Sequence, residues 1–387
     1  SGTVTGTVTG TATDTAGPAT DQVVSWGASP DVLPGSLDDQ TVRNLVHTSV
    51  GGPGVRVELS NAFGTAPVTF DSVYVGVRDA GADVVPGSNR RATFGGADAV
   101  TVAPGAHVLS DPVDWNVPPD TTVAVSVHAV GQQTTPTGHL RAFQTSFVAA
   151  GDAAHDEDGT PFTTTTDHWY WVSGLVVDAP RAVDTLAVLG DSITDGRGST
   201  VGADHRWPDY LADQVSQAPV GERYGVMNQG IGANRVLSNA TSLGALARFD
   251  RDVLAKPDVE TVIVLEGIND IGNGDATSAD QLVAAYRQLL ARAHAVGVCV
   301  VGGTLTPFEG AFYYDATKEA VRADVNQWIR TTDELDGVVD FDAAVRDPAA
   351  PRRLLPQHDS GDHLHPGDAG YAAMAAAVDP EVLRCHR

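Results

Sequence analysis

Five short apolar runs separated by helical stretches constrain the fold of the second half of the chain more than any other feature. The runs are LAVLG (186–190), YGVMN (224–228), TVIVLEG (261–267), VCVVGG (298–303) and GVVDF (337–341). Each is apolar throughout, as expected for a strand of a parallel sheet that is covered on both faces. Strands of this kind alternating with helices predict a doubly wound, five-stranded parallel α/β sheet, with functional residues at the carboxyl ends of the strands.

The helical stretches carry recognisable start and stop signals. Ser278 and Gln281 form a capping-box pattern, an apolar stripe with helical spacing follows, and Gly297 is a stop signal. A second amphipathic stretch follows Asp315. Pro366 suits the first position of a last helix, because proline is tolerated where the backbone N–H has no helical partner. We therefore expect helices after residues 278, 315 and 365.

The first half of the chain has a different pattern. Runs such as VRVELS (55–60), VTFDSVYVGV (68–77) and TTVAVSVHAV (121–130) are separated by Gly, Pro, Asp and Asn. Residues 55–60 alternate between apolar and polar, the period of a sheet with one buried face. We predict an antiparallel β-sandwich of jelly-roll type over residues 23–180, after a flexible leader at 1–22. A polar, Pro-containing linker at 178–184 leads into an α/β domain over residues 181–387.

Composition excludes several classes of protein. A protein with a formal charge of −25 and a pI of about 4.6 would repel the phosphates of nucleic acid. The sequence has no run of 18 apolar residues, so we do not expect it to insert into a membrane. The chain begins without Met, as a mature or trimmed form would, so we expect a secreted protein. Cys299 and Cys385 are compatible with one disulfide, but equally with a buried free thiol at Cys299.

A serine follows the first strand of the α/β half directly, in the segment Gly190-Asp191-Ser192. A tight turn after a parallel strand presents such a hydroxyl at the sheet edge, where it can act as a nucleophile. Gly, Asp and Ser are also the commonest residues of inert loops, so the motif alone decides nothing. It requires a general base elsewhere in the chain.

The segment Asp362-His-Leu-His365 near the end of the chain supplies that partner. The spacing can place the Asp362 carboxylate beside one ring nitrogen of His365 while the other nitrogen faces Ser192. We predict a Ser192–His365–Asp362 triad. His363 fits a surface or supporting role better than a metal ligand, because no further cluster of ligands has supporting spacing. We predict neither a metal nor an organic cofactor.

Two loops at strand ends offer hydrogen-bond donors for an oxyanion. The second strand is followed by a Gly-rich loop in which Gly232 and Ala233 can present backbone N–H groups, and the third by Asn269, whose amide can point to the same place. Each loop alone could be ordinary turn chemistry. Together with the Ser192 N–H, we predict that Gly232, Ala233 and Asn269 form an oxyanion hole.

These motifs give the second half of the chain, from about residue 186 to 378, a resemblance to the SGNH (GDSL-like) hydrolase superfamily. Ser192 matches the Ser block, Asn269 in GIND the Asn block, and Asp362 with His365 in DHLHP the His block. The Gly block departs, because Ala233 stands where family members often have glycine. The resemblance implies the flavodoxin-like SGNH fold. The whole chain also resembles secreted actinobacterial hydrolases with a β-sandwich containing a stretch like VRVELSNAFGTAPVTF (55–70).

We therefore predict a monomeric serine esterase that hydrolyses carboxylic esters through an acyl-enzyme on Ser192. Its expected substrates are small-molecule or glycan esters with short acyl groups, such as acetyl groups on carbohydrate. Two alternatives remain open at this point. One is a lipase or phospholipase of the same superfamily, and the other is a carbohydrate-binding protein whose sandwich domain carries the main role.

Overall fold

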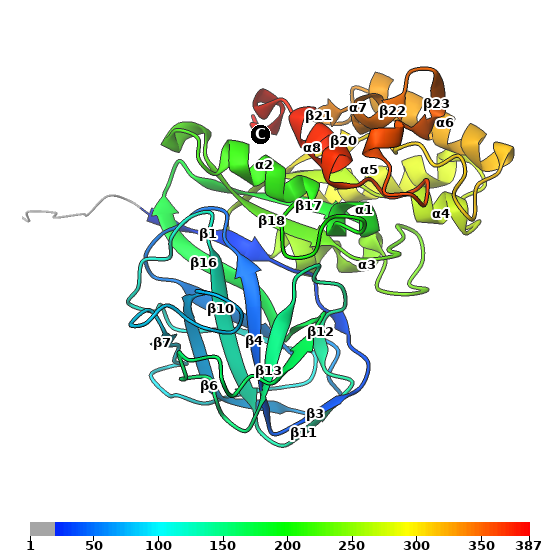
Figure 1. Ribbon diagram of the computed structural model, residues 1–387. Coiled ribbons are helices and arrows are strands. Elements are labelled where there is room, and N and C mark those ends of the chain that lie inside the picture. Colours follow the sequence, from blue (N-terminus) through cyan, green and yellow to red (C-terminus); the bar gives the residue numbers. More distant parts are fainter. Residues whose placement is uncertain (1–19) are drawn as a thin grey trace, which may run out of the picture.

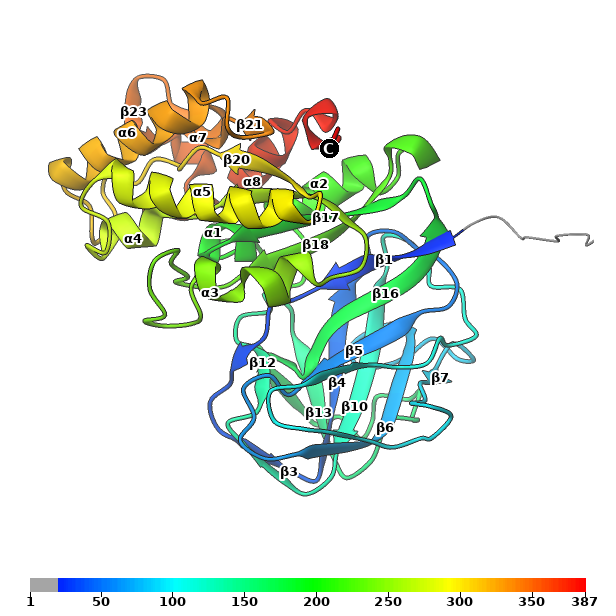
Figure 2. The same ribbon diagram turned by 180° about the vertical axis from the view of Figure 1, so that it is seen from behind.

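The computed structural model describes residues 20–387 and has two domains that lie against each other (Figures 1 and 2). We refer to residues 20–180 as the β-domain and to residues 184–387 as the α/β domain. Residues 1–19 of the leader expected at 1–22 lie outside the described residues. Its last three residues, from Thr20 onward, already belong to strand β1, so the β-domain begins three residues earlier than predicted.

The β-domain contains only antiparallel sheets, as predicted. One sheet has the order β1 (Thr20–Gly27), β16 (Val172–Pro180), β5 (Arg56–Ser60) and β9 (His107–Leu109). A second has the order β14 (Thr164–Thr166), β13 (Ser146–Ala150), β4 (Gln40–His47), β10 (Thr122–Ala129), β6 (Val68–Val77) and β7 (Arg90–Arg91), with β8 (Val100–Val102) paired to β6. Short strands β3 (Ser36–Asp38) and β11 (Gln132–Thr134) form a ribbon, and β2 (Asp31–Val32), β12 (Thr137–His139) and β15 (Trp169–Tyr170) form a small sheet.

Residues 55–60 alternate between the two faces of the sheet, and both faces are buried here. Val55, Val57 and Leu59 are fully buried in the β-domain core. Glu58 was expected on a solvent-exposed face but is only 4% exposed, because Lys256 of the α/β domain lies over it and forms a 2.5 Å ion pair with its carboxylate. This strand is therefore covered on one face by its own domain and on the other by its neighbour.

The α/β domain has the predicted five-stranded parallel sheet, in the order β18-β17-β19-β20-β21. The strands are β17 (Asp184–Gly190), β18 (Tyr224–Gly230), β19 (Val259–Leu265), β20 (Cys299–Gly303) and β21 (Gly337–Val339). Helices α2 and α8 lie on one side of the sheet and α3 and α5 on the other (Figures 1 and 2). The strand order reverses beside β17, which is the switch point where doubly wound sheets bind their ligands.

The helices are α1 (Ser192–Asp195), α2 (Trp207–Val215), α3 (Ala245–Phe249), α4 (Ile268–Gly272), α5 (Ala279–Ala295), α6 (Ala316–Thr331), α7 (Phe341–Val345) and α8 (Asp368–Ala376). Single helical turns occur at Val220–Glu222, Asp250–Leu254, Pro356–His358 and Pro380–Leu383, and strands β22 (Arg346–Asp347) and β23 (Ala350–Leu354) form a hairpin. The capping box of Ser278 and Gln281 opens α5, and Asp315 caps α6, as predicted. None of these helices combines the length and apolar character needed to cross a bilayer.

The last helix begins later than predicted. Pro366 forms an isolated antiparallel bridge with Asp359, and Gly367, in extended conformation, caps α8. The N–H of Gly367 donates a hydrogen bond to the carbonyl of His358. Because the backbone on both sides of residue 366 is engaged with the preceding turn, helical geometry starts only at Asp368.

The two domains share a hydrogen-bonded interface along β1, which lies beside the edge strand β18 (Figure 1). The N–H of Val24 donates to Thr185 Oγ1, and the N–H of Val226 donates to Ser49 Oγ, each at 3.0 Å. The predicted linker at 178–184 is largely strand, since β16 ends at Pro180 and β17 begins at Asp184. A connection this short, together with the cross-domain hydrogen bonds, restricts relative motion of the domains.

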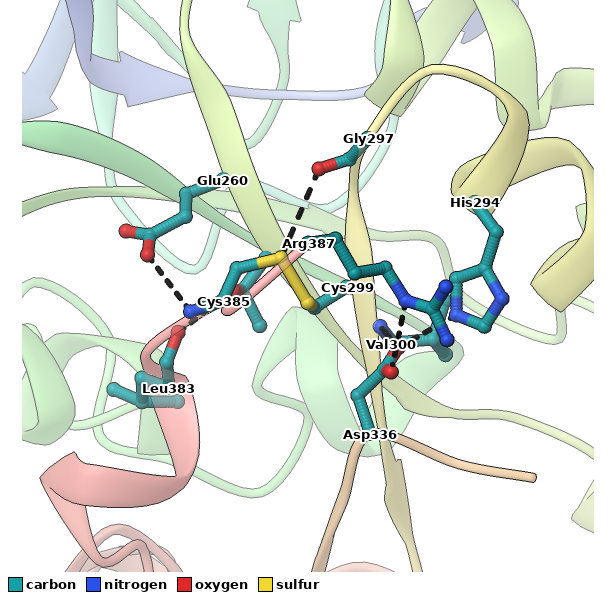
Figure 3. The surroundings of a disulfide bond; sticks show 10 residues. Glu260, His294, Gly297, Cys299, Val300, Asp336, Leu383, Cys385 and Arg387 are labelled. Carbon is teal, nitrogen blue, oxygen red and sulfur yellow. Dashed lines mark hydrogen bonds and ion pairs between the residues drawn. A yellow bond between two sulfur atoms is a disulfide. The ribbon is translucent and has the colours of Figure 1, made fainter. Parts of the chain in front are cut away.

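A disulfide joins Cys299, at the start of β20, to Cys385 near the end of the chain (Figure 3). The N–H of Cys385 also donates to the Glu260 carboxylate at 2.8 Å, and Arg387 pairs with Asp336 at 3.1 Å (Figure 3). The bridge resolves the alternative left open by the sequence, because no free thiol remains at Cys299.

Candidate active site

Ser192 lies at the carboxyl end of β17, as the first residue of helix α1. Asp191 caps this helix by accepting a 2.9 Å hydrogen bond from the N–H of Ile193. The turn requires glycine at position 190, because a Cβ there would lie 2.2 Å from Thr194 Oγ1 and 2.9 Å from the Leu265 carbonyl oxygen. The sharp strand-to-helix turn therefore places the Ser192 hydroxyl at the edge of the sheet, as the sequence motif predicts.

His365 and Asp362 meet Ser192 from the loop between β23 and α8. The distance between Ser192 Oγ and His365 Nε2 is 2.7 Å, and that between His365 Nδ1 and an Asp362 carboxylate oxygen is 2.5 Å. Ser192 and His365 are buried, whereas the Asp362 side chain is partly exposed. Hydroxyl, imidazole and carboxylate thus form one continuous hydrogen-bonded chain, which is the geometry that activates a serine.

The Asp362 carboxylate is held in its charged form. Partial burial alone would raise its pKa, but hydrogen bonds from the His365 ring, the His365 N–H and the Leu364 N–H hold the pKa well below its usual range. The carboxylate can therefore fix the orientation of the imidazole ring and stabilise its positive charge.

His363 points to a different partner. Its Nδ1 bonds to Asp359 at 2.7 Å, and almost half of its side chain is exposed. The residue adopts a left-handed conformation with φ of 64°. This turn in the backbone allows His363 and His365, two positions apart, to form separate carboxylate pairs.

The loop after β18 brings two N–H donors to the same site. Gly232 and Ala233 line a cavity together with Ser192. Neither of their N–H groups donates a hydrogen bond to another described residue. Ala233 has a φ of 59°, a conformation that favours glycine. The alanine that replaces the expected glycine therefore adopts a backbone conformation typical of glycine, at the cost of local strain.

Asn269 is the second residue of helix α4, after β19, and contacts this loop without lining the cavity. Its Nδ2 donates to the Asn234 carbonyl at 3.0 Å, and its Oδ1 accepts a 2.9 Å hydrogen bond from the Tyr313 hydroxyl. The carboxamide is thus fixed in orientation, with one amide hydrogen engaged by the backbone next to Ala233. Tyr313, which carries no recognisable motif in the sequence, is thus one of the two residues that orient it.

Several buried carboxylates brace the loops. Asp270 accepts hydrogen bonds from the N–H groups of Val236 and Leu237, so it fixes the loop after β18. Burial raises the pKa of Asp191 to about 7 and that of Glu266 well above its usual value. Arg235 pairs with Asp275 at 2.9 Å. This pair ties the loop after β18 to the segment after α4, whereas Glu266 lies buried with one carboxylate oxygen 3.6 Å from the Arg248 guanidinium.

Arg248 is a fully buried residue that sequence reasoning missed. Its guanidinium donates to the carbonyls of Gly190 and Gln229, where β17 and β18 end, and to Asn234 Oδ1. It also donates to Ser29 Oγ of the β-domain at 3.1 Å. One side chain therefore fixes the turn before Ser192, the neighbouring loop and the facing domain. Nothing in its local sequence distinguishes it from a surface arginine.

The β-domain forms part of the cavity wall. The cavity has a volume of about 250 Å³, and His139, Leu140, Arg141 and Phe143 line it opposite Ser192. His139 Nε2 bonds to Asp195 of α1 at 2.7 Å, and its Nδ1 to the Ser29 carbonyl at 2.8 Å. Sequence patterns do not reveal these residues, because they reach the site only through packing of the two domains.

Comparison with known proteins agrees with this arrangement. Residues 188–373 match the model of the GDSL-like lipase/acylhydrolase family, and this domain belongs to that family. No curated protein matches the chain.

Solved structures similar to the α/β half include an acetyl xylan esterase from Geobacillus stearothermophilus, with 23% identity over 53% of this chain and 99% of that one and a TM-score of 0.41. A carbohydrate acetylesterase family member from Sinorhizobium meliloti has 16% identity over 51% and 97%, with a TM-score of 0.42. A GDSL-like lipase from Bacteroides thetaiotaomicron has 18% identity over 51% and 87%, with a TM-score of 0.38.

Proposed function

We propose that the protein is a serine esterase that hydrolyses carboxylic esters through an acyl-enzyme on Ser192. The observation that carries the proposal is the 2.7 Å contact between Ser192 Oγ and His365 Nε2, extended by the 2.5 Å contact between His365 and Asp362. Membership of the α/β domain in an acylhydrolase family supports the same chemistry.

In the proposed mechanism, Ser192 Oγ attacks the ester carbonyl carbon while His365 Nε2 takes the hydroxyl proton. Asp362 orients the ring and stabilises the imidazolium that forms. The C–O bond to the alcohol then breaks, and His365 returns the proton to the leaving alcohol. Water attacks the acyl-enzyme with His365 again as base, which releases the acid and restores Ser192.

The oxyanion of each tetrahedral intermediate needs donors that are free to bind it. We propose the N–H groups of Ser192, Gly232 and Ala233 for this role, because the latter two donate to no other described residue. Asn269 has a second amide hydrogen available once the first is bonded to Asn234, so we retain it as a donor. One such donor typically contributes about 3 to 4 kcal/mol to transition-state stabilisation.

We propose short acyl esters, including acetyl esters of carbohydrates, as the substrates. The cavity of about 250 Å³ lies below the range of roughly 300 to 1,000 Å³ that is usual for ligand sites, and it is bounded by both domains. A lipase-type function would need room for a long chain. A purely carbohydrate-binding role would leave the Ser–His–Asp geometry without a purpose.

We further propose that the protein works outside the reducing cytoplasm. The disulfide between Cys299 and Cys385 supports this, because such bridges persist mainly in oxidising compartments.

The test compares the intact protein with Ser192→Ala on p-nitrophenyl acetate, butyrate and octanoate. We expect Ser192→Ala to lose at least about 10⁴-fold in kcat, since removing a catalytic serine abolishes covalent catalysis. We expect kcat/KM to fall from acetate to octanoate. The control is Ser88→Ala in the β-domain, whose hydroxyl bonds only to its local turn. A Ser192→Ala variant that retains activity would contradict the mechanism, and a preference for octanoate would contradict the short-acyl proposal.

A further inference from the structure

Two arginines face the cavity at Ser192 without any partner of their own. Arg141 comes from the β-domain and Arg197 from the segment just after α1, and both are exposed. Neither guanidinium forms an ion pair or hydrogen bond with another described residue. Among the described arginines, only Arg90, Arg181 and Arg352 share this condition, and none of those three lines this cavity.

Unpaired arginines are unexpected in this chain, whose formal charge is −25. Carboxylates are abundant, and most arginines are engaged, as Arg235 is by Asp275 and Arg206 by Asp209. In the cavity, Asp195 is occupied by His139, which leaves Asp31 as the one carboxylate without a cationic partner. The two guanidinium groups therefore place unpaired positive charge on the wall of this cavity, in a molecule whose net charge is strongly negative.

The loop that carries Arg141 is held in place from both domains. The N–H of Ala142 donates to the Asp167 carbonyl, and the Ala142 carbonyl accepts a hydrogen bond from Arg206 of the α/β domain. The Phe143 carbonyl accepts from the N–H of Gly202 at 3.0 Å. Phe143 has a φ of 49°, which is rare for a bulky residue and marks a segment that its surroundings hold fixed.

The backbone on the other side is fixed as well. The N–H of Arg197 donates to the Ser192 carbonyl at 3.0 Å, and its own carbonyl accepts a hydrogen bond from the buried Tyr371 hydroxyl. Both arginines thus extend from anchored backbone next to the nucleophile. A guanidinium carried on such backbone can bind a carboxylate, sulfate or phosphate through paired N–H donors.

We propose that Arg141 and Arg197 bind an anionic group of the substrate, so that the protein prefers esters carrying a negative charge near the ester bond. This inference rests on the proposed esterase function and deepens it. The substrate class it indicates is acyl esters of acidic carbohydrates, such as acetylated uronic acids. Arg141 would make the β-domain a determinant of specificity, not only a support for the α/β domain.

The test uses matched pairs of neutral and anionic esters. The alcohol-side pair is the same O-acetylated methyl glycoside with either a hydroxymethyl group or a carboxylate at C6, with acetate release as the readout. The acyl-side pair is p-nitrophenyl butyrate and p-nitrophenyl hemisuccinate. We expect the intact protein to prefer the anionic glycoside by about tenfold in kcat/KM at low salt, mostly through KM, and the preference to shrink as salt screens these exposed charges.

In the Arg141→Gln/Arg197→Gln double variant the preference should fall to about one, and Arg141→Lys should retain part of it. Arg181→Gln is the matched control, because Arg181 is also unpaired but precedes β17 at the opposite end of the sheet.

Equal rates for neutral and anionic esters in the intact protein would overturn the inference and leave the esterase proposal standing. So would a double variant that keeps the preference. A preference confined to the hemisuccinate would overturn the acidic-alcohol assignment. No Ser192-dependent hydrolysis of any ester would instead overturn the proposed function.

Discussion

The two domains contribute to the site in different ways. The α/β domain supplies every group in the hydrogen-bonded chain from Ser192 through His365 to Asp362, and each follows the end of a strand or precedes a helix of that domain. The β-domain supplies no member of this chain. It supplies a fixed loop at 140–143 and the buried His139, which contacts the helix that begins with Ser192.

The difference teaches that the catalytic groups and part of the substrate-facing wall come from separate domains. The groups that must exchange protons come from one domain, where their distances depend on few elements. Arg141 and its neighbours on the cavity wall come from the facing domain, whose loops can change without disturbing the triad. Variants on each side of the cavity should therefore fail in different ways, and the following experiments measure that contrast.

The largest effect should come from Asp362→Asn in the α/β domain. An amide keeps the size of the side chain but cannot stabilise the imidazolium, and it favours the wrong tautomer of His365. We expect kcat to fall by about 10⁴-fold with KM little changed. The control is His363→Gln on the same loop, whose ring bonds to Asp359 and not to Ser192; its activity should stay within about twofold. An active Asp362→Asn enzyme would show that the carboxylate only supports the loop.

A smaller effect should come from His139→Gln in the β-domain. This change leaves Asp195 buried without its cationic partner, which typically costs about 3 kcal/mol or more in the free energy of unfolding. Because Asp195 ends helix α1, we also expect kcat/KM to fall by roughly tenfold. His128→Gln is the matched control, since His128 is a buried histidine between Asp39 and Asp71 that does not line the cavity. It should lose stability and keep its activity when folded. Equal kinetic losses in both variants would remove the special role of His139.

The penalty for His139→Gln should depend on pH. Burial lowers the pKa of His139, but the charge and hydrogen bond of Asp195, the hydrogen bond to the Ser29 carbonyl and the charge of Asp31 together outweigh burial, so the pKa lies above the usual 6.5. The folded state then binds the proton more tightly than the unfolded state, and the stabilisation is fully present below about pH 6.5 and lost as the pH rises through the folded pKa. We would measure denaturant unfolding of the intact protein and of His139→Gln from pH 6 to 9, and we expect the difference between their free energies of unfolding to shrink as the pH rises. A constant or growing difference would contradict the charged pair.

The smallest effect should come from Ala233→Gly. Glycine relieves the strain of a φ of 59° but adds freedom to the unfolded chain, so we expect a gain of at most about 1 kcal/mol in the free energy of unfolding. The backbone N–H is kept, and kcat should remain within about twofold. Ala240→Gly, at an exposed position of the same loop without positive φ, should instead lose a few tenths of a kcal/mol. A large loss of kcat in Ala233→Gly would show that the methyl group itself positions the substrate.

Sequence reasoning succeeded where the determinants are local. The capping box of Ser278 and Gln281, the Asp315 cap and the five apolar strands each depend on neighbouring residues, and the structure has all of them. The position of Ser192 followed because it comes directly after a parallel strand, and the pairing of His365 with Asp362 followed from their spacing of three residues. The start of the last helix was wrong because the bridge between Pro366 and Asp359 depends on how the preceding turn folds back.

The parts that could not be predicted depend on contact between the domains. Glu58 is buried by Lys256, which lies 198 positions further along the chain, and His139 meets Asp195 across 56 positions. The unpaired state of Arg141 and Arg197 is likewise a property of the surrounding surface. No periodicity in the sequence reports which side chains will lack a partner once two domains meet.

The disulfide described above has a practical consequence for handling the protein. Cys299 lies at the amino end of the sheet, whereas Ser192 lies at the carboxyl end, and Cys385 fixes the last described residues beside Cys299. A tag or solid support attached after Arg387 should therefore face away from the cavity. Immobilisation through that end should keep the entrance open, provided that the coupling chemistry contains no reducing agent.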